Sequence, residues 1–348
     1  MRIKNCVEQI KNTVSVIVPV YRTYYQIERC ILSLLFQTYN SIEVITIDDG
    51  SPDGSGELCD ELALSDCRIQ VHHKINGGLS SARQSGFICS NGEFILFVDS
   101  DDYAETSMIE KLLNALYQKT ADLVVCSYSV DRGNIVNCIS LPYVNYSLLE
   151  GREEIIEHYV KPLIGKEKNE IGIPGFLCIR LHKRSLIKNY FFASERIYYL
   201  EDHVFDLLYA DNISSIVFVN EPLYHYCINN DSLTNCFRPN KWKMYRNLLT
   251  FYNDYISKRN ISNCDSRLMN FINSAFQASV DNAVNSGSYE FFLNELKEIS
   301  DTPILQKLWL MKSKISMNCF QRLILYLYHY KLYYILYKIR KWRISIIR

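Results

Sequence analysis

The sequence predicts an α/β fold in which a mostly parallel sheet carries helices on both faces. Short apolar runs of strand length alternate with stretches of helical periodicity through the first hundred residues, which is the pattern of repeated strand–helix units. Of the 348 residues, 48% are hydrophobic, enough for a large core and too many for a disordered chain. Beyond residue 240 only helical patterns remain, so a helical C-terminal region should follow the sheet.

The individual elements follow from this alternation. The apolar, β-branched runs at 13–20, 43–47, 68–73 and 94–98 predict four strands. Helical spacing of apolar residues predicts helices at 24–37, after Gly54 and at 79–89.

After residue 104 the pattern loosens. We expect a helix at 108–117, strands at 122–127 and 135–141, a helix at 151–160, an exposed loop at 161–170, a helix within 198–210 and a strand at 215–219. Helices at 242–256, 267–284 and 289–299 should follow.

The domain organisation is predicted from this change of pattern. A catalytic domain should span 1–239, with one half at about 1–103 and a second at about 104–239. A helical extension should cover 240–301 and a basic aromatic tail 302–348, with Pro239 marking the boundary.

The buried strand at 94–98 runs directly into Asp99-Ser100-Asp101-Asp102. Carboxyl ends of parallel strands are where open α/β sheets bind ligands. Three carboxylates within four residues repel one another, and a divalent cation with a phosphate-bearing ligand offsets that charge best. The alternative is an acidic helix N-terminus, because acids suit the first turn of a helix.

Two more turns follow strand ends, at 48–51 (DDGS) and 76–78 (NGG). Parallel strands place these turns on one edge, so they should converge. Asp49 could accept hydrogen bonds from a base or ribose, the two glycines would let backbone amides approach a ligand, and Arg83 could reach phosphate. Taken singly, each could also be an ordinary turn or an exposed arginine.

Together with 16–21 (VIVPVY) and the Ala82-Arg83 pair, these motifs resemble the successive motifs of family-two glycosyltransferases with the GT-A fold. The resemblance covers about the first hundred residues in order and spacing. It implies an inverting, metal-dependent hexosyltransferase of the bacterial surface-polysaccharide type, with a nucleotide-sugar donor, usually UDP-linked, and Mn²⁺ or Mg²⁺ as cofactor. Gln84 stands where the family commonly has Asn.

The resemblance also implies roles for particular residues. Asp101 would be the principal metal ligand, with Asp99 lying near both the metal and the ribose. The remaining donor-binding residues would be Pro19, Tyr21, Asp49, Gly78, Arg83, Ser100 and Ser232.

The stretch 199–205 (YLEDHVF) resembles the family's Glu-Asp motif at the start of a helix. Asp202, with Glu201 beside it, would be the catalytic base that takes the proton of the attacking hydroxyl. The metal would stabilise the departing diphosphate. One base and one in-line attack imply inversion at the anomeric carbon. The alternative is a pair of acids that only favour a helix N-terminus.

The segment 222–234 resembles the family's diphosphate-closing segment, in which Ser232 matches the serine. Cys227 stands where an arginine is frequent, which leaves open what contacts the phosphates. His225 or Arg238 could substitute, although His225 could equally be a strand histidine with an ordinary hydrogen bond.

The tail at 302–348 contains ten Lys and Arg residues and no Asp or Glu, while the whole chain has a formal net charge of zero. Aromatic, apolar and basic residues mingle at 323–342, as in helices that lie on an anionic membrane surface. Two alternatives are a helical hairpin packed as core or dimer interface, and a nucleic-acid surface. No nucleic-acid motif accompanies the tail, so we expect no nucleic-acid partner.

The predicted cellular location rests on two features that we do not find in the sequence. We find no long apolar stretch of membrane-spanning length and no apolar signal-peptide centre near the N-terminus. We therefore expect a cytoplasmic protein, peripheral on the cytosolic face of the inner (plasma) membrane, with oligomerisation left open.

The predicted function is transfer of a sugar from a UDP-sugar to a hydroxyl of a glycan, as on a lipid-linked oligosaccharide acceptor. One alternative is a non-catalytic scaffold that binds sugar nucleotide or glycan at the membrane. Another is a nucleotidyl- or phosphotransferase, for which the chain lacks a basic phosphate loop.

Overall fold

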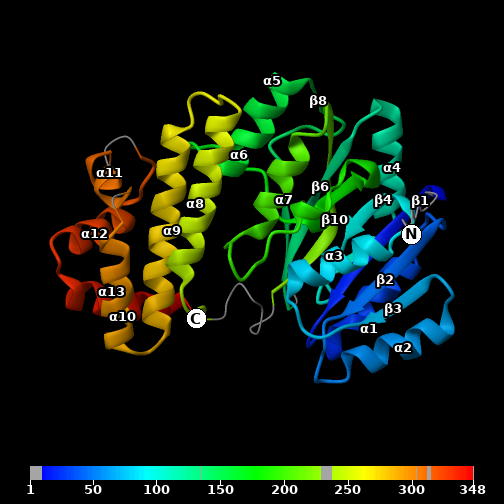
Figure 1. The fold of residues 1–348 in the computed structure, drawn as a ribbon, viewed down its shortest axis with the longest axis horizontal. Helices are drawn as coiled ribbons and strands as arrows, with labels where there is room; N and C mark the ends of the chain where they lie inside the picture. Colours follow the sequence, from blue (N-terminus) through cyan, green and yellow to red (C-terminus); the bar gives the residue numbers. More distant parts are fainter. Residues whose placement is uncertain (1–9, 134, 229–236, 303, 312–314, 348) are drawn as a thin grey trace, which may run out of the picture. The chain divides into compact units, whose positions relative to one another are not determined.

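The computed structural model describes residues 10–133, 135–228, 237–302, 304–311 and 315–347. The chain forms two compact units (Figure 1). The first unit comprises Met1–Val160, Ile173–Arg196 and Leu200–Asn229, and the second Lys161–Gly172, Ile197–Tyr199 and Asn230–Arg348. The functional division at residues 103, 239 and 301 remains a prediction.

A ten-stranded mixed sheet forms the centre of the first unit. Its strands are β1 (Ile10–Val20), β2 (Ile42–Asp48), β3 (Ile69–His73), β4 (Gly92–Phe97), β5 (Tyr103–Ala104), β6 (Leu123–Arg132), β7 (Ile135–Ile139), β8 (Leu148–Glu150), β9 (Arg180–Lys183) and β10 (Ser215–Cys227). The strand order is β3-β2-β1-β4-β9-β6-β10-β5, while β7 pairs with β6 and β8 with β10.

The first four predicted strands form a continuous parallel block, β3-β2-β1-β4. The side chains of Val16, Ile17, Val18, Ile45 and Leu96 are fully buried, which explains why the strands read as unbroken apolar runs. Burying each such side chain stabilises the fold by roughly 1.5–3 kcal/mol. The parallel pairing of β6 with β10 resumes beyond the antiparallel strand β9.

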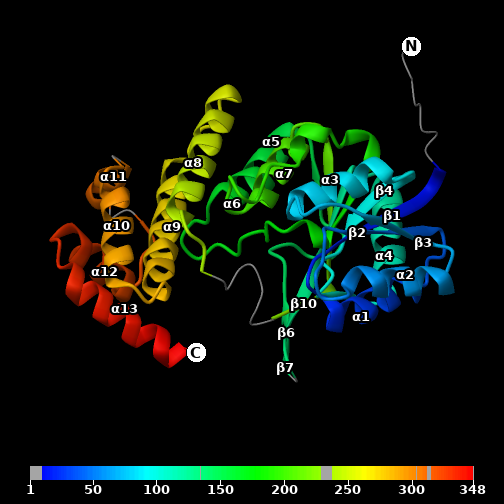
Figure 2. The ribbon, with the colours of Figure 1, turned by 60° about the horizontal axis from the view of Figure 1, so that its bottom comes forward.

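Helices cover both faces of this sheet, as predicted. Figure 2 shows α1 (Tyr24–Leu35) and α2 (Ser55–Ser65) on one face and α3 (Leu79–Cys89) and α7 (Glu201–Ala210) on the other. A Cβ at Gly86 of α3 would lie 2.4 Å from Ile17 of β1, so glycine permits α3 to pack closely on the strands that carry the turns. The remaining helices of this unit are α4 (Met108–Lys119) and α5 (Arg152–Ile155), the π-helix η1 (Ile156–Val160) and the 3₁₀ turns η2 (Leu177–Ile179), η3 (Arg184–Leu186) and η4 (Asn189–Phe191).

Two local predictions require correction. The strand predicted at 215–219 continues to Cys227, because it pairs with β6 along its length despite irregular register around Pro222. The exposed loop predicted at 161–170 begins instead with α6 (Lys161–Ile164), whose residues are buried. Charge and Pro162 suggested exposure, but α6 continues the helical backbone of α5 and η1 without a break, and its side chains are buried.

The second unit is helical. Besides α6 it contains α8 (Lys241–Lys258), α9 (Asp265–Asn285), α10 (Tyr289–Ser300), α11 (Ile304–Leu310), α12 (Cys319–His329) and α13 (Tyr333–Ile347). The aromatic stretch at 323–342 is therefore two helices and not one, because the chain turns at Lys331, which has a left-handed φ of 56°.

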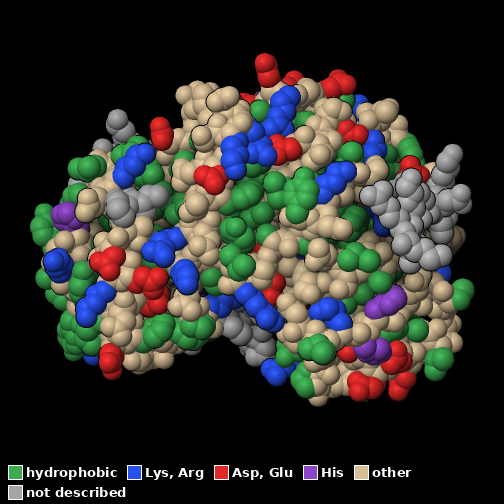
Figure 3. Space-filling view, in the orientation of Figure 1, with side chains coloured by type: hydrophobic (Ala, Val, Ile, Leu, Met, Phe, Trp, Pro, Cys, Tyr) green, Lys and Arg blue, Asp and Glu red, His purple; other side chains and the backbone are tan. Residues whose placement is uncertain are grey.

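The tail helices α12 and α13 have one packed face and one open face. Tyr328 of α12 stacks edge-on against Phe276, and Tyr337 of α13 against Phe292. The opposite faces expose aromatic and basic side chains. On the left of the view, Figure 3 shows hydrophobic and Lys or Arg side chains with some acidic ones among them. The exposed large apolar and aromatic residues are Leu323, Tyr326, Tyr330, Leu332, Tyr334, Ile335, Trp342 and Ile346.

Candidate active site

The three turns predicted to converge do lie together at the carboxyl edge of the parallel block. Adjacent strands β3, β2, β1 and β4 end there side by side. The backbone amides of Gly77 and Gly78 donate to the Asp49 carboxylate at 2.9 and 2.7 Å, and Lys74 Nζ donates to it at 2.6 Å. Asp49 is almost fully buried, so one carboxylate fixes the glycine turn to the end of β2.

Gly78 adopts a left-handed φ of 93°, a conformation that favours glycine. A Cβ there would lie 1.9 Å from the carboxylate of Glu195, which also accepts a hydrogen bond from the Ser80 amide at 3.2 Å. Glu195 thus lies against the N-terminus of α3, where a negative charge is favourable.

The three acids after β4 have separate surroundings. Asp102 is buried and accepts hydrogen bonds from the Tyr224 hydroxyl at 2.6 Å and the Cys227 amide at 2.7 Å. Burial, then Asp101 and Asp99, raises the pKa of the Asp102 carboxyl well above its ordinary value. Asp102 therefore ties the acidic loop to β10.

Asp99 and Asp101 are the more accessible members of this loop, and the Asp99 side chain is 30% exposed. The Asp101 backbone carbonyl accepts a hydrogen bond from Arg29 at 2.7 Å. Ser100 is buried and accepts one from the Thr23 hydroxyl at 3.0 Å. The loop is thus held from α1 as well as from β10, and Asp99 and Asp101 remain partly exposed.

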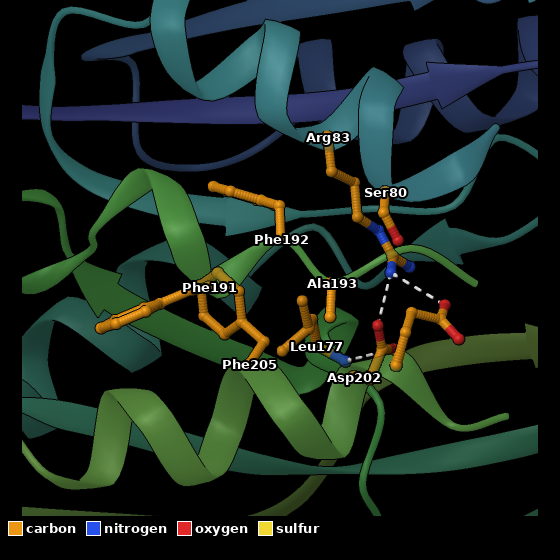
Figure 4. A pocket seen from close by; sticks show the side chains of 9 residues that line it. Ser80, Arg83, Leu177, Phe191, Phe192, Ala193, Asp202 and Phe205 are labelled. Atoms are coloured by element: carbon orange, nitrogen blue, oxygen red, sulfur yellow. Dashed lines mark hydrogen bonds and ion pairs between the residues drawn. The ribbon is translucent and has the colours of Figure 1, made fainter. Parts of the chain in front are cut away.

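Arg83 joins the two halves of the candidate site (Figure 4). From α3, its guanidinium donates to Asp202 at 2.5 Å and to Asp99 at 2.9 Å, and lies 3.8 Å from Glu201. The Arg83 side chain is only 3% exposed. Burial alone would lower the pKa of the guanidinium, but Asp202 and Asp99 raise it well above its ordinary value.

Glu201 and Asp202 begin α7, where the helix dipole favours negative charge. Leu200 before them has a left-handed φ of 65°, which costs roughly 1–2 kcal/mol for a residue with a Cβ. The Leu177 amide donates to Asp202 Oδ2 at 3.2 Å.

Burial raises the pKa of Asp202, and the neighbouring Asp99 adds to the rise while Arg83 opposes it. Burial and Asp202 together raise the pKa of Glu201 to about 8, again against Arg83. A carboxylate with a raised pKa is a stronger base, as general-base catalysis needs.

Glu201 and Asp202 line a small pocket of about 180 Å³, a volume that includes space open to solvent. Ser80, Arg83, Glu201 and Asp202 supply its polar wall, and the other lining residues are Leu177, Phe191, Phe192, Ala193 and Phe205 (Figure 4). An apolar wall beside these polar groups lowers the local dielectric and so strengthens the electrostatic interactions between them.

The other predicted residues have varied positions. Pro19 is buried within β1 opposite Ile47, whereas Tyr21, just after β1, is 42% exposed. Ser232 lies outside the described residues. His225 is buried, and its ring nitrogens lie 2.8 Å from Glu105 and 3.2 Å from Asp131. His225 thus has hydrogen-bond partners within the fold, and its role toward the phosphates remains a prediction.

Sequence reasoning missed two charged residues behind the pocket, Arg180 and Asp206. Their side chains form a fully buried ion pair at 3.0 Å. The available signals were an arginine directly after the apolar run at 176–179 and a carboxylate four residues after Asp202.

The site fits a divalent cation only together with a ligand. Within the described residues, no group of three or more His, Cys, Asp or Glu side chains is arranged to hold a metal ion. Asp99 and Asp101 supply hard oxygen donors, whereas both carboxylate oxygens of Asp102 already accept hydrogen bonds, from Tyr224 and Cys227. Mg²⁺ commonly binds through one or two carboxylates plus substrate phosphates, so this donor set suits a cation that a diphosphate helps to coordinate.

The strand order and the acidic carboxyl edge define a GT-A-like fold. S. aureus TarS, residues 1–349 in complex with UDP-GlcNAc, has a similar structure, with a TM-score of 0.65 and 18% identity over 97% of this chain and 92% of that one. The mannosyltransferase PcManGT from Pyrobaculum calidifontis, in complex with GDP-Man and Mn²⁺, matches with a TM-score of 0.51 and 12% identity over 94% and 86%. At these identities the likeness concerns the fold.

Sequence relatives define the family. The sequence model named "Glycosyl transferase family 2" matches residues 15–180. The chain is 35% identical to the uncharacterized glycosyltransferase EpsJ of Bacillus subtilis strain 168, over 70% of each chain. It is 34% identical to the glycosyltransferase GlyG of Streptococcus pneumoniae serotype 4, over 61% of this chain and 70% of GlyG. The chain belongs to glycosyltransferase family 2, as the motifs indicated.

Proposed function

We propose that this glycosyltransferase moves a sugar from a UDP-sugar to a hydroxyl of a growing glycan, with inversion at the anomeric carbon. The observation that carries the proposal is the Arg83 bridge, which joins a carboxylate of the acidic loop, Asp99, to the candidate base, Asp202. Likeness to a fold that binds UDP-GlcNAc in TarS supports the donor class.

In this mechanism the oxygen of the acceptor hydroxyl attacks the anomeric carbon while Asp202 removes the hydroxyl proton. The nucleoside diphosphate leaves as the new bond forms. Arg83 and the Leu177 amide hold the two oxygens of that carboxylate. Asp101 and Asp99 would hold Mn²⁺ or Mg²⁺, which when bound offsets the negative charge of the diphosphate. The apolar wall of the pocket limits the access of water, which would otherwise compete as acceptor.

The proposed context is surface-polysaccharide assembly on a lipid-linked acceptor at the membrane. The relatives EpsJ and GlyG are named as glycosyltransferases, and the exposed basic and aromatic faces of α12 and α13 suit an anionic membrane surface. No helix in the described part of the chain combines the length and apolarity needed to cross a membrane.

The direct test is a screen of UDP- and GDP-sugars with Mn²⁺, read by nucleotide release, with nucleoside triphosphates as a separate arm. We expect release from one UDP-sugar. Binding of UDP without release from any donor, even with lipid-linked acceptors, would favour the scaffold alternative. Turnover of triphosphates alone would favour a nucleotidyltransferase.

The site assignment is tested by Asp202→Asn and Asp101→Ala. Asp202→Asn should lower kcat by about 10²–10⁴-fold, the usual contribution of a general base, while UDP binding persists. Asp101→Ala should abolish the response to Mn²⁺. Asp211→Asn, after the last turn of the same helix and paired with Arg152, is the matched control. Wild-type activity in Asp202→Asn would refute the assignment of the base.

A further inference from the structure

Arg180, the first residue of β9, is fully buried and takes no part in the mechanism above. Its Nε donates to the Tyr159 hydroxyl at 2.9 Å, and its two terminal nitrogens donate to the backbone carbonyls of Phe176 and Pro174. It also forms the buried ion pair with Asp206 at 3.0 Å. Desolvating two such charges costs several kcal/mol each, and apolar residues of similar size would commonly fill the space at no loss of stability.

The partners of Arg180 lie on both sides of Asp202. Pro174 and Phe176 belong to the segment that continues into Leu177, whose amide donates to Asp202 Oδ2. Asp206 follows Asp202 by four residues on α7, so the two carboxylates share one face of the helix. Arg180 therefore holds both the backbone that contacts the carboxylate and the helix that carries it.

Tyr159 completes this arrangement from the π-helix η1. Its hydroxyl is fixed by Arg180 Nε, and its ring is buried. Single π-helical turns are frequent near functional sites, and here the turn places a hydroxyl against the guanidinium. Three separate segments thus meet at one buried arginine.

We propose that Arg180 and Asp206 form a positioning pair that holds Asp202 in the geometry required for proton transfer. The inference rests on the proposed role of Asp202 as the base. Neither member of the pair lines the pocket, so both act through Asp202 and do not touch substrate. A displacement of about 1 Å in a catalytic group can lower the rate about 100-fold. Loss of the pair should lower the rate by up to about that factor.

Charge provides a second effect of the pair. The groups that face Asp202 are Arg83 from α3, Asp99 after β4, Cys178 in η2, Glu201 and Asp206 on α7, and Arg180. Arg180, like Arg83, lowers the pKa of Asp202 against the effect of burial. Loss of the Arg180 charge should therefore raise that pKa and leave less ionised base at a given pH.

The test compares Arg180→Met and Arg180→Lys with wild type. Arg180→Met should lower kcat about 10–100-fold, with the donor KM changed less than about 3-fold, and should move the acid limb of the kcat/KM profile to higher pH. Arg180→Lys keeps the charge but not the geometry of the hydrogen bonds, so kcat should fall while the acid limb stays in place. Lys183→Met, on the same strand and paired with Asp122, should match wild type.

If Arg180→Met does not fold, the double variant Arg180→Met/Asp206→Leu takes its place in the test, because it removes both buried charges together. This double variant should fold, bind UDP and show the same loss of kcat. Wild-type kcat and pH profile in the folded single or double variant would overturn the positioning role, even if Asp202→Asn is inactive. Full activity in Asp202→Asn would instead refute the underlying assignment of the base.

Discussion

Arg83 shows how one side chain can serve two halves of a site. The sequence suggested a phosphate contact for it, and the structure gives it two carboxylate partners, Asp99 and Asp202. A buried guanidinium with planar, paired donors suits this bridging role better than lysine. Its charge also moderates the rise in the pKa of Asp202 that burial causes.

Replacing Arg83 with Met should destabilise the protein and impair catalysis. We expect a loss of about 3 kcal/mol in the free energy of unfolding, the low end for breaking a buried ion pair because Asp99 stays partly hydrated. Because the Arg83 charge lowers the pKa of Asp202, its loss should shift the acid limb of kcat/KM to higher pH. Urea unfolding and a pH–rate profile measure the two effects, with Lys119→Met on exposed α4 surface as control.

An unchanged acid limb in folded Arg83→Met would show that Arg83 does not act on the titrating base. Arg83→Lys should fall between wild type and Arg83→Met in both measurements, because the charge is retained and the two-pronged hydrogen bonding is lost.

Among the secondary-structure elements, β9 carries a second residue with an unusual environment. His182 is fully buried, and its ring meets those of Phe97, Phe205 and Tyr209 edge-on. Burial, then the charge of Arg180, lowers the pKa of His182 to about 3. The folded protein therefore holds this histidine neutral, while the unfolded chain protonates it near its ordinary pKa of about 6.5.

This difference makes stability depend on pH in a known direction. Neutral His182 contributes its full stabilisation above about pH 6.5. This stabilisation is lost as pH falls, and the loss reaches about 2.5 kcal/mol by pH 4.5. His182→Phe should remove that part of the acid slope. Urea unfolding between pH 7 and 4.5 measures it, with exposed His158→Phe as control. Parallel slopes for wild type and His182→Phe would contradict the prediction.

At the scale of the whole molecule, the basic C-terminal tail of the sequence forms helices of the second unit. On α13 the exposed residues Tyr334, Lys338, Lys341 and Trp342 recur at helical spacing. Arg340 between them is buried and pairs with Asp281. The tail therefore uses some of its basic residues for internal packing and others for a surface.

We expect Lys338→Glu/Lys341→Glu to weaken binding to anionic vesicles by about 30-fold or more, because each basic residue near such a surface contributes on the order of 1 kcal/mol. Co-sedimentation with vesicles containing phosphatidylglycerol measures this, and added salt should weaken wild-type binding. Lys243→Glu/Lys258→Glu makes the same charge change on exposed positions of α8. Equal losses in both double variants would argue against a specific tail surface.

The sequence alone determined the four strands of the parallel block, the turns that follow them, the Glu-Asp pair and the family, because each depends on local runs or on motifs a few residues long. The spatial order of those strands came from the tertiary structure. The Arg83 bridge, the commitment of Asp102 to Tyr224, and the division of the tail into a packed and an open face required tertiary structure. So did the Arg180–Asp206 pair, whose members are 26 residues apart and whose partners come from η1 and from the segment before η2. Such contacts depend on how distant segments pack around buried charge, which no local pattern encodes.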